Sequence, residues 1–108
     1  MTETEKAYQG EDANLESLRV QIDECDKDII KLLARRFELV QKIGIYKAIH
    51  DLPVLDEARE AELLSDRKQR ASVSGNYSVK DIFKLILEES RQIQMKVRED
   101  LGSDKADC

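Results

Sequence analysis

The chain has 108 residues, which is the length of one domain. Only 5% of the residues are aromatic and there is a single proline, so a β-sandwich or barrel is disfavoured, while 41% hydrophobic residues are too many for a disordered chain. The net charge of −5 argues against nucleic acid as the main partner, because a phosphate backbone requires a cationic surface. No apolar run is long enough to span a membrane.

The first predicted element is a very long helix, from about residue 15 to 49. Asn14 is a suitable N-cap, and the only proline follows at Pro53. The apolar residues between them recur at alternating spacings of four and three, with a gap at Arg36, as in a packed helical seam. They are Leu18, Ile22, Cys25, Ile29, Leu32, Leu39, Ile43 and Tyr46.

The length of this helix predicts a dimer. It would extend about 50 Å, whereas a compact monomer of this size has a radius of gyration of only about 13 Å. The apolar stripe runs along the whole helix, so a second chain is needed to cover it. We therefore expect an all-α fold with three helices per chain, one of them very long, in an intertwined homodimer.

Two more helices are expected after the proline. Asp56 can cap a helix over about 57–70, and a turn-rich connector follows over 71–76. Ser78 with Asp81 is a capping-box signature ahead of an apolar run, which predicts a third helix ending near residue 98.

We expect one domain over 1–108, with an ordered core of about 15–97 and flexible tails at 1–13 and 99–108. The polar N-terminal residues lack the apolar stretch of a signal peptide. Cys25 lies in the apolar stripe and is expected to be a buried small side chain rather than a nucleophile or half of a disulfide. These features favour a cytoplasmic protein.

Polar residues at apolar positions mark a candidate site. Arg36 interrupts the long stripe; it either snorkels to the edge of the seam or meets an anion. Lys47 lies about 16 Å further along nearly the same face, so the two cations could flank a small dianion. Arg19 lies too far away to join them within one chain, but an antiparallel partner helix could bring it there. Taken alone, Arg19 is an ordinary surface arginine.

The third helix carries a similar interruption. Ser90 and Gln94 share an inward face, which indicates a pocket, although Ser90 could bond back to a backbone carbonyl and Gln94 could be a satisfied core amide. Asp56 also suits an N-cap, and Glu60 a helix surface. The sequence has no glycine-rich phosphate loop, no His/Cys metal-binding spacing and no recognisable Ser/His/Asp set, so we expect neither a metal nor a cofactor.

These residues together resemble the all-helical class of chorismate mutases. The similarity covers about residues 15–97 and is carried by five ordered blocks: 18–23 (LRVQID), 32–36 (LLARR), 43–47 (IGIYK), 53–60 (PVLDEARE) and 86–90 (ILEES) with Gln94. The resemblance implies conversion of chorismate to prephenate in phenylalanine and tyrosine biosynthesis, in a swapped homodimer and without a cofactor.

The resemblance also implies a role for each polar residue. Arg19 of the neighbouring protomer and Arg36 would hold the two substrate carboxylates, with help from Ser90. Lys47 would bond a carboxylate and the ether oxygen, and Gln94 would donate to that same oxygen. The substrate hydroxyl would bind to a carboxylate pair, Glu60 supported by Asp56, with Arg59 orienting nearby carboxylates. Apolar walls would come from Ile43 and Leu87.

Two alternatives stay open. One is an isochorismate pyruvate-lyase, which shares the fold and a similar cationic pocket, although Asp56, Arg59 and Glu60 resemble the mutases more. The other is a catalytically silent helical dimer that regulates an enzyme of the shikimate pathway.

Overall fold

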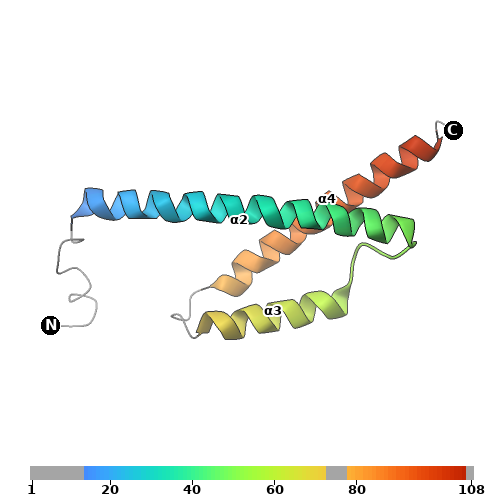
Figure 1. The fold of residues 1–108 in the computed structure, drawn as a ribbon. Helices are drawn as coiled ribbons and strands as arrows, with labels where there is room; N and C mark the ends of the chain where they lie inside the picture. The colour runs from blue at the N-terminus through green and yellow to red at the C-terminus, as the bar shows by residue number, and fades with distance from the viewer. Residues whose placement is uncertain (1–13, 73–77, 107–108) are drawn as a thin grey trace. The chain divides into compact units, whose positions relative to one another are not determined.

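A computed structural model describes residues 14–72 and 78–106. Within these ranges the chain forms three α-helices and no strand: α2 (Leu15–Ile49), α3 (Glu57–Ser72) and α4 (Val79–Ala106), drawn in Figure 1. The all-α prediction is confirmed. The chain divides into two compact units, Met1–Arg36 and Phe37–Cys108, and helix α2 crosses their boundary.

The predicted helix starts are confirmed. The Asn14 Oδ1 atom accepts hydrogen bonds from the backbone N–H groups of Glu16 (2.8 Å) and Ser17 (3.2 Å), as an N-cap does. At the start of α3 the Asp56 Oδ1 atom accepts from the Arg59 backbone N–H at 3.0 Å. These caps satisfy backbone donors that have no partner within the helix.

The predicted end of the third helix is wrong, because α4 continues past residue 98 to Ala106. No proline interrupts this stretch, and an ion pair between Lys96 and Asp100 (3.5 Å, i to i+4) supports the added turns. Helix α3 also runs slightly beyond its predicted end, to Ser72. The predicted tail over 1–13 and most of the predicted connector lie outside the described residues.

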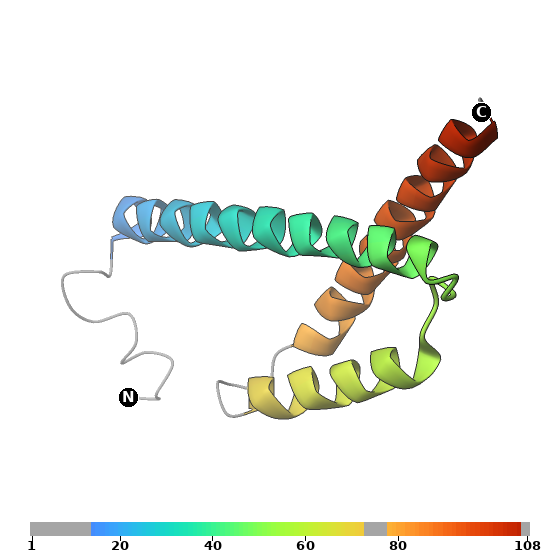
Figure 2. The same cartoon turned by 45° about the vertical axis from the view of Figure 1, so that its right-hand side comes forward.

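The small core of the unit Phe37–Cys108 lies among its three helical segments. Val40 of α2, Leu63 of α3 and Leu87 of α4 are buried, and so are the polar side chains of Ser90 and Gln94. Helix α3 packs against α4. Figures 1 and 2 both show α4 crossing the C-terminal part of α2. Among the described residues, two of the five buried side chains are therefore polar, and both belong to the predicted site.

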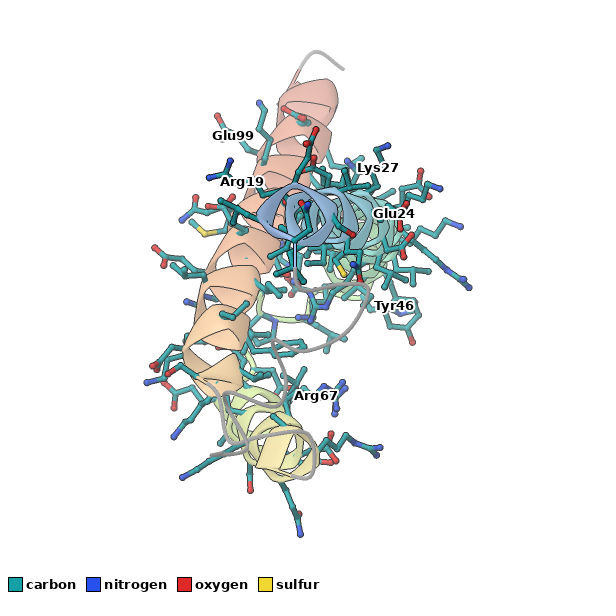
Figure 3. The ribbon with its side chains drawn as sticks, turned by 90° about the vertical axis from the view of Figure 1, so that its left-hand side faces the viewer. Arg19, Glu24, Lys27, Tyr46, Arg67 and Glu99 are labelled. Carbon is teal, nitrogen blue, oxygen red and sulfur yellow. The ribbon has the colours of Figure 1, made fainter. Side chains whose placement is uncertain are left out.

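The described part of the unit Met1–Arg36 is helical and presents its apolar side chains to solvent. Six of them are more than half exposed: Leu15, Val20, Ile22, Ile29, Ile30 and Leu32. In Figure 3 the labelled side chains of Arg19, Glu24 and Lys27 project outward from the same helix. Cys25 is exposed as a free thiol, so its expected burial is not met within one chain. The homodimer stays a prediction.

Candidate active site

Lys47 and Gln94 meet directly in the unit Phe37–Cys108. The Lys47 Nζ atom, near the C-terminal end of α2, donates hydrogen bonds of 2.8 Å to the Gln94 Oε1 atom of α4 and to the Val54 backbone carbonyl. The Gln94 side chain is 7% exposed and Lys47 is half-buried. Two residues singled out because they broke the apolar pattern therefore lie side by side, although they are far apart in sequence.

This contact determines which way the Gln94 amide faces. An ammonium group can only donate hydrogen bonds, so the amide oxygen must face Lys47 and the amide nitrogen must face away from it. The Gln94 Nε2 atom donates to the Ser90 carbonyl at 3.2 Å. An amide nitrogen carries two hydrogens, so Gln94 has one donor position besides its bond to Ser90.

Ser90 is also buried, at 4% exposure, and its Oγ atom donates to the Ile86 carbonyl at 2.6 Å. Both structural roles considered from the sequence are therefore present: Ser90 bonds back to a backbone carbonyl, and Gln94 is a satisfied buried amide. These contacts hold the side chains in place, and they leave the predicted substrate contacts of both residues as predictions.

Lys47 forms no ion pair with a carboxylate among the described residues. None of the ion pairs within 14–72 and 78–106 includes Lys47, and both of its hydrogen-bond acceptors are neutral. Because both acceptors are neutral groups, the half-buried ammonium exerts a positive local field. Such a field favours an anionic ligand or negative charge that develops during a reaction.

A cavity of about 610 Å³ opens beside Lys47. It is lined by Lys47, Leu52, Pro53, Leu55, Asp56 and Glu57. This volume lies within the usual range for small-molecule sites, roughly 300–1,000 Å³. Two side chains fix the backbone of the segment 52–54 beside this cavity. Lys47 of α2 donates to the Val54 carbonyl, and Arg98 of α4 donates to the Leu52 carbonyl.

Arg91, which the sequence analysis did not select, pairs with Glu60. The Arg91 Nη1 atom of α4 donates to the Glu60 Oε1 atom of α3, and the two side chains are 31% and 21% exposed. Arg91 directly follows Ser90 and precedes Gln94 by three positions, which is the only signal for it in the sequence. Glu60 is therefore not simply a solvated residue on the helix surface, because its carboxylate joins α3 to α4.

The other predicted residues are less tightly placed. Asp56 is exposed and caps α3, and Arg59 is exposed with a weak 3.9 Å contact to Glu62. In the unit Met1–Arg36, Arg19 is exposed and Arg36 is half-buried. The joint action of these two arginines with Lys47 stays a prediction.

Gly44 allows the close approach of α2 and α4 that brings Lys47 to Gln94. A Cβ atom at Gly44 would lie 3.2 Å from the Gln94 Cα atom and 3.4 Å from the Val97 Cβ atom. We expect Gly44→Ala to change the free energy of unfolding by less than about 1 kcal/mol, because the higher helix propensity of alanine offsets the crowding. Turnover should nevertheless fall several-fold, because α4 must shift to make room for the Cβ atom and Gln94 shifts with it.

The matched control for that variant is Gly102→Ala, because a Cβ atom at Gly102 meets nothing within 4 Å. This control should keep full turnover in a steady-state assay. Equal turnover in the Gly44 and Gly102 variants would show that close helix packing at Gly44 does not set the position of Gln94.

The described residues show two further absences. Among them, no three His, Cys, Asp or Glu side chains are grouped so as to hold a metal ion. Neither is any helix in these ranges long and apolar enough to cross a membrane.

Comparison with known proteins identifies relatives of the chain. The family model described as chorismate mutase type II matches residues 18–95. The T-protein of Enterobacter agglomerans is 38% identical over 80 residues (72% of this chain and 21% of that protein), and the T-protein of Haemophilus influenzae is 35% identical over 78 residues (70% and 21%). The bifunctional chorismate mutase/prephenate dehydratase of Buchnera aphidicola is 36% identical over 87 residues (78% and 22%).

The chain thus spans about a fifth of the length of these relatives. No solved structure matches it significantly.

Proposed function

Since this chain belongs to the type II chorismate mutase family, we propose that it rearranges chorismate to prephenate in phenylalanine and tyrosine biosynthesis, without a cofactor. The observation that carries the proposal is the contact between Lys47 and Gln94, two side chains that can donate hydrogen bonds, of which Lys47 lines a cavity of suitable size. The name of the Buchnera relative, which includes chorismate mutase activity, supports it.

The reaction needs little from the protein beyond shape and fixed dipoles. A pericyclic rearrangement breaks the ether C–O bond as a C–C bond forms, with no acid, base or nucleophile. Holding the flexible dianion in its compact, reactive shape can contribute several kcal/mol. Negative charge grows on the breaking ether oxygen, where a well-aimed donor contributes about 3 kcal/mol.

The described contacts suit these two tasks. Lys47, which forms no ion pair in the described ranges, would donate to the ether oxygen and to a substrate carboxylate. Its ammonium has three hydrogens, so one of its bonds to Gln94 and Val54 would be exchanged for a bond to substrate. Gln94 would direct its second amide hydrogen at the same oxygen. Glu60, in the first turn of α3, would accept the substrate hydroxyl, supported by Asp56 at the N-cap of that helix. Arg36 and Ser90 would hold carboxylates.

We further propose that the active unit is a homodimer in which Arg19 reaches the site of the partner protomer. The exposed apolar side chains of the long helix support this proposal, because a second chain that covered them would remove a large apolar area from water.

A cytosolic location is also proposed, supported by the exposed free thiol of Cys25, which suits a reducing compartment.

One ultraviolet assay separates the candidate functions. The purified chain is incubated with chorismate and, separately, with isochorismate, and loss of each substrate is followed by absorbance. Conversion of chorismate to prephenate supports the mutase. Release of pyruvate from isochorismate, with chorismate left unchanged, would identify a lyase. A folded dimer that leaves both substrates unchanged would be the silent regulatory partner.

The Gln94 amide predicts the pH dependence. Because an amide is neutral at all working pH values, turnover should be nearly flat from about pH 6 to 8. In Gln94→Glu a carboxylate would face the Lys47 ammonium and would need a proton before it could donate to the ether oxygen. We expect that variant to lose most activity at neutral pH and to regain it on acidification, as measured by kcat/KM against pH. A flat profile for the variant would argue against Gln94 as a donor.

A further inference from the structure

Glu60 brings a negative charge to a site that is proposed to bind a dianion. It lies in the first turn of α3, four positions after Asp56 at the cavity wall, and its side chain is only 21% exposed. A carboxylate placed there can accept a substrate hydroxyl, but it also repels the carboxylates of the substrate. A site of this kind works best when a fixed cation offsets that charge.

Arg91 is placed to provide that cation. Its guanidinium donates to one oxygen of Glu60, Oε1, across the interface between α3 and α4. Both side chains are partly shielded from water, so the pair is screened less than a surface ion pair. Arg91 also lies within one turn of Gln94 on α4, and turn neighbours on a helix face the same side.

We propose that Arg91 is a positioning residue that acts through Glu60. The guanidinium offsets the Glu60 charge and holds Oε1, so that Oε2 accepts the hydroxyl hydrogen of an anionic substrate. This inference rests on the proposed function. It adds a residue that lets the site bind a negatively charged substrate despite the charge of Glu60. Arg91 itself does not touch the reacting atoms in this scheme.

The first test compares Arg91→Gln with Arg91→Lys. Loss of the charge should raise the KM for chorismate about tenfold, with kcat nearly unchanged, because repulsion by Glu60 acts equally on bound substrate and transition state. Arg91→Lys keeps the charge and should restore most of the affinity. The KM increase of Arg91→Gln should also shrink at high ionic strength, where salt screens the repulsion. The control is Lys96→Gln, which removes a 74% exposed cation from the same helix.

The decisive test is a double-mutant cycle with Glu60→Gln. Once Glu60 is neutral, replacing Arg91 should have no further effect on KM. An equal KM increase in both backgrounds would mean that Arg91 binds substrate directly or is only structural, and would overturn the proposal. So would an unchanged KM in Arg91→Gln. If Arg91→Gln loses its helical circular dichroism, the cycle is run with Arg91→Met, which also removes the charge, and judged in the same way. A wild-type protein inactive on chorismate refutes the proposed function itself, whereas an active one with additive effects refutes only the role of Arg91.

Discussion

Replacement of Lys47 by methionine should lower kcat/KM roughly a thousandfold, the upper range for loss of one donor to developing negative charge. Methionine keeps most of the apolar stem of lysine, so the loss reports on the ammonium group. Two 2.8 Å hydrogen bonds disappear in this variant, to Gln94 and to Val54. We therefore also expect the free energy of unfolding to fall by about 1–2 kcal/mol. Steady-state kinetics and denaturant unfolding measure the two effects separately.

Lys42→Met is the matched control, because Lys42 is an exposed lysine on the same helix. It should retain wild-type kinetics. If the Lys47 variant is as active as this control, the positive charge beside Gln94 has no part in the reaction, and the proposed function loses the observation that carries it.

Mixing two inactive variants should restore activity if each site takes Arg19 from the partner protomer. Arg19→Ala and Lys47→Met each damage every site of their own homodimer. A hybrid dimer has one site with both residues intact and one with neither. Random exchange at equal concentrations makes half of the dimers hybrids, so about a quarter of wild-type activity should return. The measurement is turnover of chorismate after subunit exchange.

Subunit exchange must be shown independently, for example with two affinity tags that co-purify only in hybrids. A mixture that exchanges and stays inactive would refute the shared site. A protein that sedimented as a monomer at assay concentration and still turned over chorismate would refute both the dimer and the role of the partner Arg19.

The helices, and most of the polar residues of the candidate site, could be predicted from the sequence. Helix periodicity and N-caps are local properties, so Leu15–Ile49 and the starts of α3 and α4 followed from the pattern. Lys47, Ser90 and Gln94 stood out because a polar residue on an apolar face is visible without knowledge of the fold. The end of α4 was missed because polar helix formers after residue 98 carry no apolar repeat, whereas local backbone bonds can still continue the helix.

Which of these residues contact one another depends on the packing of the helices. The pairing of Lys47 with Gln94, and of Glu60 with Arg91, depends on how the helices cross, which periodicity along one helix does not specify. Arg91 was therefore not selected from the sequence, because a charged residue beside Ser90 looks like any solvated side chain and its position near Gln94 is only a weak signal. Gly44 was recognised only as part of a motif. Its function as the point of close approach to α4 follows from the structure, where a Cβ atom at Gly44 would lie only 3.2 Å from the Gln94 Cα atom.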